Sequence, residues 1–441
     1  MADHASSQPV DAHQLGKSGD TIANAALLVA VLGVAASLLI GALGDGGWDR
    51  LEQSYLTAFI FVTTISLGAL FWTMIQHATR AGWGVVSRRV CENVAGNLTV
   101  LVPILFIPVL IAMWFGHLYH HWSDPALVDP NSSYYDPVID HKSPYLNKPF
   151  WVFRAILFLG IWSFLAWFFR RHSVDQDATG DVAHTHRMQA LAPVGLVLFA
   201  LTLTFASIDW VKSINSHWFS TMFGVYFFAA ACTGFFSVQI IAVFLLQKAG
   251  KLKEFTVEHY QDAGKLLFAF GMVFWAYIAF SQYVLIWYAN LPEETTWYGA
   301  RMLGGWQGVT IFLLLAHFIV PFVLFISKWP KRFAPTAVIM AGWMLLIHYI
   351  DMYWLVMPMT PPSAMWNEAG ESFSNLRVIT DAAIAAGDEK YAGFSPSLMD
   401  LTCLLALGGL MVNVTIRRFA SAALHPVHDP RLHESLAFEN M

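Results

Sequence analysis

The sequence predicts an all-α integral membrane protein of about ten transmembrane helices. Hydrophobic residues make up 56% of the 441 residues and charged residues only 12%, whereas a soluble domain carries about 25% charged residues. A helix that crosses the hydrocarbon core needs about 20 mostly apolar residues. Ten segments meet this requirement: 22–43, 54–78, 97–118, 150–169, 190–208, 218–246, 265–290, 302–326, 334–358 and 397–416. Each is too long and too apolar for a β-strand, and irregular backbone does not face lipid.

The basic residues predict how these segments are oriented. When the loops are numbered alternately, sixteen of the 25 Lys and Arg residues fall on one side and seven on the other, while Arg154 and Lys265 stand at helix starts. The side richer in Lys and Arg is expected in the cytoplasm. Residues 1–21 and 419–441 then form a cytoplasmic arm and a cytoplasmic tail, which requires an even number of spans.

Several classes of function are disfavoured by the composition and by missing motifs. A net charge of -5 argues against a nucleic-acid partner. Cys91, Cys232 and Cys403 are too far apart to form an iron–sulfur cysteine set or a c-type haem attachment. There is no Gly-rich phosphate loop and no HExxH motif. We therefore predict no metal site, no cofactor bound by this chain itself and no certain catalytic residue.

Two matching dipeptides in the sequence favour two four-helix bundles. An Ile-Asp pair ends at Asp209 near the outer end of the fifth segment, and another ends at Asp351 near the outer end of the ninth. An internal repeat would explain the match, although chance would also produce a matched dipeptide. The membrane domain, 22–418, would then contain bundles over about 97–246 and 265–416, plus two peripheral helices.

Ionisable residues inside spanning helices predict a path for protons, since they are expensive in the membrane and by default mark a functional route. The candidates, with hydrogen-bonding tyrosines, are His317, His348, Asp351, Tyr277, Tyr283, Asp209 and Lys212. Their positions along the helices place His317 in the inner half and Tyr277 near the middle, with His348, Asp351 and Tyr283 in the outer half. The alternatives are a neutral core histidine at 317, a buried neutral acid at 351 and an interfacial Asp209–Lys212 ion pair.

A second group of histidines follows the third segment. His117, His120 and His121 cluster where this segment leaves the membrane. They are candidates for binding a quinone headgroup or a metal, and the alternative is that they are ordinary interfacial residues.

Four long stretches of the chain resemble a known family. They are SIDWVKSINSHWFSTMFGVYFF (207–228), FSQYVLIWYANLPEETTWY (280–298), HFIVPFVLFISKWPKR (317–332) and HYIDMYWLVMP (348–358). In these stretches the chain is similar to the NrfD/PsrC-type membrane subunits, and among them to the ActF-type subunits of alternative complex III. The resemblance runs from the first segment to the tenth.

The resemblance implies a subunit of a quinol:electron-acceptor oxidoreductase in a bacterial inner membrane. Such a complex oxidises a membrane quinol and passes electrons through iron–sulfur and haem c subunits to cytochrome c or to a terminal oxidase. The implied partners are an ActC-like sister subunit, where the family places the quinol site more securely, the iron–sulfur and haem c subunits, and membrane lipids. This chain would anchor the assembly, contact quinone or conduct protons. The implied fold is two four-helix bundles plus two peripheral helices.

Two other classes of function remain open from the sequence. Secondary transporters also combine repeats with ionisable residues near the midplane, but no segment here shows the paired Gly/Pro interruption of a broken helix. A purely structural membrane scaffold is the other alternative, in which none of the buried ionisable residues would carry protons.

Overall fold

The computed structural model describes residues 15–44, 47–115, 118–358 and 393–440, and regular structure within them is entirely helical. Ten helical segments are long and apolar enough to cross a membrane: Gly19–Leu43, Gly47–Ala78, Val85–Phe115, Lys148–Thr179, Ala183–Ile214, Phe223–Lys248, Val257–Ala289, Trp306–Phe325, Ala334–Val356 and Leu398–Ser421. The prediction of an all-α integral membrane protein is confirmed. His117 and most of the loop at 359–396 lie outside the described residues.

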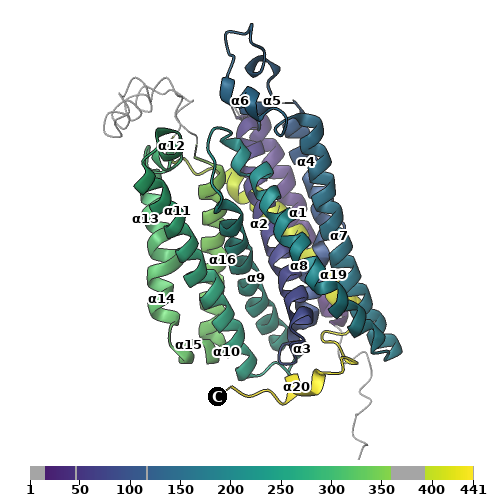
Figure 1. The fold of residues 1–441 in the computed structure, drawn as a ribbon. Helices are drawn as coiled ribbons and strands as arrows, with labels where there is room; N and C mark the ends of the chain where they lie inside the picture. Colours follow the sequence, from purple (N-terminus) through teal and green to yellow (C-terminus); the bar gives the residue numbers. More distant parts are fainter. Residues whose placement is uncertain (1–14, 45–46, 116–117, 359–392, 441) are drawn as a thin grey trace, which may run out of the picture.

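The helices run roughly parallel in one elongated body (Figure 1). The spanning segments contain α1 (Gly16–Leu43), α2 (Gly47–Ala78), α3 (Val85–Ala95), α4 (Leu101–Phe115), α7 (Lys148–Thr179), α8 (Ala183–Trp210), α9 (Phe223–Lys248), α10 (Val257–Leu266), α11 (Trp275–Ala289), α13 (Trp306–Leu313), α14 (Val320–Phe325), α16 (Ala334–Val356) and α19 (Leu398–Ser421). Two π-helical segments, η5 (Leu267–Phe274) and η6 (Leu314–Ile319), join α10 to α11 and α13 to α14.

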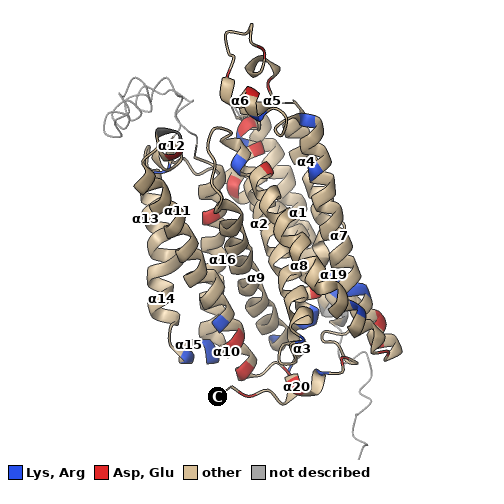
Figure 2. Ribbon diagram, viewed as in Figure 1, with Lys and Arg blue, Asp and Glu red and all other residues tan. Residues whose placement is uncertain are grey.

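Short helices mark the two ends of this body. One end carries α5 (His120–Ser123), α6 (Pro137–Lys142) and α12 (Pro292–Ala300), and we call it the loop end. The other carries α15 (Lys328–Arg332), α20 (Leu432–Leu436) and the C terminus, and we call it the tail end. Charged residues lie mainly toward these two ends (Figure 2), as expected if the apolar middle faces hydrocarbon.

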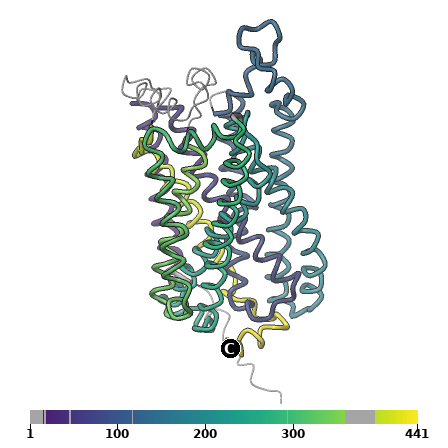
Figure 3. Tube along the Cα trace, turned by 60° about the vertical axis from the view of Figure 1, so that its left-hand side comes forward, coloured from purple at the N-terminus to yellow at the C-terminus, as the bar shows by residue number. Residues whose placement is uncertain are grey.

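Helix contacts define two four-helix sets. They begin at the second span, whereas the bundles predicted from the sequence begin at the third. The second to fifth spans, 47–214, pack on one another, and the sixth to ninth spans, 223–356, form the other set. The two sets meet through α2, α8, α9 and α16, while α1 and α19 pair outside them. The predicted bundles, 97–246 and 265–416, leave α2 outside both, whereas α2 is a central helix with 89% of its apolar window buried. The tube in Figure 3 shows the same arrangement from a second side.

Small residues bring α1 and α19 close together. A Cβ on Gly33 would lie 2.7 Å from the backbone nitrogen of Ala406, and one on Gly409 would lie 2.8 Å from the carbonyl oxygen of Ala26. Ser37 Oγ donates to Thr402 Oγ1 at 2.7 Å. Close backbone approach and interhelical hydrogen bonds drive association where lipid is as apolar as the helices themselves. The first and last spans are therefore held together by van der Waals contact.

At the tail end, the residues between the predicted segments 54–78 and 97–118 include a buried helix. Residues 85–95 form α3, in which every residue is buried. Arg89 Nε lies 3.1 Å from Glu92 Oε2, and Arg89 Nη2 lies 2.6 Å from Asp177 Oδ2. Arg88 pairs with Asp429 of the C-terminal segment. The arginines can be buried because carboxylates from distant parts of the chain neutralise them.

The central pair α2 and α9 gives a first prediction, that Gly68→Ala is destabilising. An added Cβ would overlap the carbonyl oxygen of Ala231 and lie 2.7 Å from Phe235 Cβ. Because backbone cannot move aside as a side chain does, we expect a loss of about 3 kcal/mol. Thermal unfolding in detergent measures it. The control is Gly160→Ala, where a Cβ meets nothing within 4 Å. Equal melting temperatures for both variants would contradict the packing described here.

Candidate functional site

The centre of the second helix set holds a carboxyl group without a cationic partner. Asp351 on α16 is fully buried. Its Oδ1 accepts a hydrogen bond from the Tyr226 hydroxyl on α9, and its Oδ2 accepts one from Trp275 Nε1 on α11 at 3.0 Å. Within the described part of the chain, no Lys or Arg side chain lies at ion-pair distance from Asp351. A buried carboxyl held only by neutral donors can exist with or without its proton.

His317 stacks on the indole of Trp275, which also donates to Asp351. The two rings stack with centroids 3.7 Å apart and planes inclined by 15°. The imidazole Nε2 lies 3.0 Å from the Gly271 carbonyl oxygen. Since a carbonyl only accepts, Nε2 carries the proton and Nδ1 is a bare acceptor. That Nδ1 is buried without a hydrogen-bond partner among the described residues.

The backbone around His317 departs from the α-helix. His317 lies in the π-helix η6, and Gly271, which accepts its hydrogen bond, lies in the π-helix η5. The Gly271 carbonyl also accepts a hydrogen bond from Thr233 Oγ1 at 3.3 Å. Single π-helical turns within α-helices are frequent at functional sites. Here the two wide turns meet at one histidine.

His348 lies one turn before Asp351 and contacts a different helix. Its Nε2 is 3.0 Å from Thr64 Oγ1 on α2. The Thr64 hydroxyl also lies 2.9 Å from the carbonyl oxygens of Ile60 and Phe61. All these groups are satisfied when Thr64 donates its one hydrogen to a carbonyl and accepts from His348 Nε2. His348 Nδ1 is then a second bare, buried acceptor without a partner in the described ranges. Gly234 makes room for the ring, since a Cβ there would lie 2.8 Å from His348 Nε2.

Two candidates from the sequence, His317 and Asp351, therefore contact Trp275, and His348 lies one turn from Asp351 on α16. We call Tyr226, Trp275, His317, His348 and Asp351 the buried cluster. Sequence reasoning missed Tyr226 and Trp275, because an aromatic residue within an apolar helix has the same pattern whether it packs in a core or donates to a carboxyl group. The only signal was their position on helices that also carry polar residues.

The positions of Tyr277 and Tyr283 do not support their predicted roles in the proton path. Tyr277 is 64% exposed and Tyr283 45% exposed. Successive residues turn by 100° around a helix, so with Trp275 facing inward, Tyr277 faces the opposite side. Gln282, in contrast, is buried and contacts Ser220 and Tyr298. Tyr277 thus belongs to the outer surface of α11.

Asp209 has a different environment from Asp351, despite the shared dipeptide. Arg154 on α7 donates to both carboxylate oxygens of Asp209, at 2.7 and 3.1 Å. Arg154, rather than the predicted Lys212, is therefore the ion-pair partner. The pair is buried and bidentate, which suits a fixed structural contact. Lys212 lies beside it in a separate cavity.

The histidines after the third span lie at the loop end, apart from the buried cluster. His120 and His121 are exposed, with ring centroids 4.4 Å apart. His117 lies outside the described residues. The described residues contain no group of three or more His, Cys, Asp or Glu arranged to hold a metal ion. Binding of quinone to these histidines stays a prediction.

Arg301 fixes the end of the helix that carries His348 and Asp351. It follows α12, is 2% exposed, and donates to the carbonyl oxygens of Trp354 (3.1 Å), Leu355 (2.9 Å) and Trp297 (2.9 Å). Its guanidinium also stacks on the Trp297 ring at 3.5 Å. The last carbonyls of a helix have no partner within the helix, and a cation there is favourable. Arg301 is a positioning residue for α16.

This contact predicts that Arg301→Gln is destabilising by about 3 kcal/mol, because buried carbonyls lose charged donors. Unfolding of the purified protein in detergent, followed by circular dichroism, measures the loss. Arg417→Gln is a matched control, since Arg417 is exposed and its contact to Asn24 lies at the surface, worth less than about 1 kcal/mol. If the two variants melt alike, Arg301 does not hold α16.

The buried cluster places three titratable side chains, those of His317, His348 and Asp351, out of contact with solvent. It offers no nucleophile with an adjacent base and no metal-ligand set among the described residues. Comparison of the chain with protein-family models and with curated proteins finds no match.

Proposed function

We propose that this chain is a membrane subunit of a quinol:electron-acceptor oxidoreductase complex and that the buried cluster conducts protons. The observation that carries the proposal is Asp351, a fully buried carboxyl group whose partners among the described residues are only Tyr226 and Trp275. A stable structural carboxylate in this setting would need a cation beside it, as Asp209 has. A group that changes its protonation during turnover does not.

The resemblance to NrfD/PsrC-type subunits supports the same proposal. The stretches that carry it include Tyr226 in 207–228, His317 at the start of 317–332, and both His348 and Asp351 in 348–358. Four of the five residues of the buried cluster therefore fall within these stretches. Trp275 lies just outside them.

In this proposal protons pass between the imidazoles and the carboxyl group through intervening water. The bare Nδ1 atoms of His317 and His348 are acceptors, and Tyr226 is the donor nearest Asp351. In the proposed bacterial inner membrane, the excess of Lys and Arg on one side favours a cytoplasmic location for the tail end. Iron–sulfur and haem c subunits, an ActC-like sister and a terminal oxidase are the proposed partners, and the redox cofactors belong to them.

Gentle purification of the tagged full chain from its native membrane tests the proposal. We expect haem c and iron–sulfur proteins to copurify, with quinol:cytochrome c activity in the same fraction and a haem spectrum that follows the partners. A chain that emerges alone and colourless, or one that takes up a solute in vesicles, would contradict membership of such a complex. Haem or iron bound to the isolated chain would contradict the absence of a cofactor of its own.

A further inference from the structure

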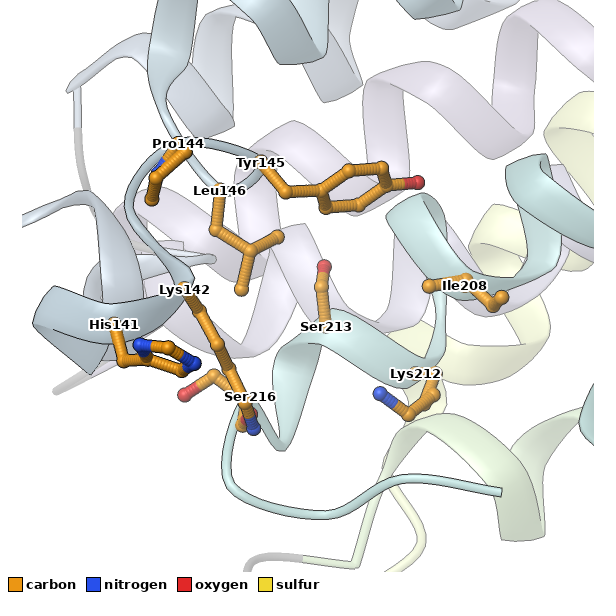
Figure 4. Close-up of a pocket in the computed structure, with 9 residues that line it drawn as sticks. All are labelled: His141, Lys142, Pro144, Tyr145, Leu146, Ile208, Lys212, Ser213 and Ser216. Atoms are coloured by element: carbon orange, nitrogen blue, oxygen red, sulfur yellow. The ribbon is translucent and has the colours of Figure 1, made fainter. Parts of the chain in front are cut away.

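A cavity of about 320 Å³ opens at the loop end, away from the buried cluster. It lies between the segment that joins α6 to α7 and the segment that follows α8 (Figure 4). Its apolar lining includes Leu146 and Ile208, and its polar lining consists of His141, Lys142, Tyr145, Lys212, Ser213 and Ser216. The cavity thus combines ammonium and hydroxyl groups with apolar side chains.

Two ammonium groups, those of Lys142 and Lys212, line this cavity, and neither forms an ion pair within the described residues. Lys142 Nζ donates to the carbonyl oxygens of Ser216 (2.7 Å) and His217 (3.2 Å), which fixes its position but leaves its charge. Lys212 Nζ has no hydrogen-bond or ion-pair partner within the described ranges, and Figure 4 shows its side chain directed toward Ser216 and Lys142. The carboxylate of Asp209 is already engaged by Arg154. An anion would complete the site.

The helix below the cavity shows what the rest of the ligand would contact. Val197, Leu201 and Phe205 are 61%, 54% and 43% exposed and are spaced four residues apart. Ile208, three residues after Phe205, lines the cavity. These residues form one apolar face of α8. From Val197 to Ile208 this face is about 16 Å long, close to half of the roughly 30 Å hydrocarbon core.

We propose that the cavity binds the phosphate of an anionic phospholipid whose acyl chain lies along this face of α8. Lys142 and Lys212 carry the recognition, as basic pockets between transmembrane helices do for acidic headgroups. The apolar face favours a lipid over free inorganic phosphate, which would use the same ammonium groups. The site is independent of the proposed function, because none of its residues belongs to the buried cluster.

Native mass spectrometry of the full chain tests the site, with phosphatidylglycerol, phosphatidylcholine or inorganic phosphate as the added probe. We expect retained phosphatidylglycerol but not phosphatidylcholine. Each Lys near an acidic headgroup is worth about fivefold in affinity. Lys212→Gln should therefore weaken phosphatidylglycerol binding about fivefold, Lys142→Gln with Lys212→Gln about thirtyfold, and Lys212→Arg should restore it.

The matched control is Lys148→Gln at the same end, whose ammonium donates to the Trp114 carbonyl and does not line the cavity. It should leave phosphatidylglycerol binding unchanged. The melting temperature of each variant in lipid-free detergent separates lost lipid binding from misfolding. If the double variant does not fold, the lipid binding of Lys212→Gln alone tests the proposal. Equal retention of the lipid by wild type and Lys212→Gln would overturn the proposal. If inorganic phosphate binds and phosphatidylglycerol does not, the ligand is not a lipid.

Discussion

Replacing Asp351 with Asn is expected to stop proton movement while electron transfer continues. Asn has nearly the same size as Asp and can still accept the Trp275 hydrogen bond, but it cannot take up or release a proton at neutral pH. In proteoliposomes of the purified complex, we expect protons moved per electron to fall at least about tenfold. Quinol oxidation measured with an uncoupler should stay within about twofold of wild type.

Two tyrosine variants make this experiment specific. Tyr226→Phe removes the hydroxyl group that donates to Asp351 and should also lower proton movement. Tyr277→Phe removes the same atom from a side chain that is 64% exposed and should change nothing. Wild-type proton movement by Asp351→Asn would show that the buried cluster is structural. Equal losses in both tyrosine variants would show that the sequence-based ladder, with Tyr277 in it, was right.

Replacing Asp209 with Asn is expected to damage stability instead. The Asp209 carboxylate accepts hydrogen bonds from Arg154 Nε at 2.7 Å and from Nη2 at 3.1 Å. An Asn amide is neutral and has only one acceptor oxygen, so it cannot replace both contacts, and Arg154 would keep its charge. Breaking one side of a buried ion pair costs about 3–5 kcal/mol, since the remaining charge stays buried. The free energy of unfolding in mixed detergent micelles measures the loss.

Matched variants separate the ion pair from its surroundings. The double variant Arg154→Met with Asp209→Leu removes both charges and should regain most of the loss, because an apolar pair needs no compensation. Lys212→Gln should cost less than about 1 kcal/mol in lipid-free detergent, since Lys212 has no ion-pair partner among the described residues. A stable Asp209→Asn protein would mean that Arg154 finds another partner and that the pair is not structural.

The two Ile-Asp pairs show where sequence reasoning reached its limit. Both aspartates were placed near the same end of a spanning helix, and both are fully buried. One meets Arg154, which stands 55 residues earlier and was treated as an ordinary helix-start residue. The other meets a tyrosine and a tryptophan from two other helices. The dipeptide carries no information about these partners, since they depend on which helices become neighbours.

Tyr277 and Trp275 illustrate the same limit within a single helix. They are two residues apart in a segment with little amphipathic pattern, because a membrane helix is apolar on the lipid side and on the protein side alike. Depth along the helix follows from the rise per residue, but the rotation about the axis does not. The depth of Tyr277 could therefore be predicted from the sequence, but the side of the helix on which it lies could not.

The sequence by itself determined that the chain is helical, that it crosses the membrane about ten times, and which buried residues are ionisable. It could do so because hydrocarbon demands long apolar helices and makes each His or Asp inside them conspicuous. Only the tertiary structure decided that α2 is central, that α3 is a buried helix held by ion pairs, and that Asp209 and Asp351 differ in their partners. These features arise from contacts between side chains far apart in the chain, and such contacts exist only once the helices have packed.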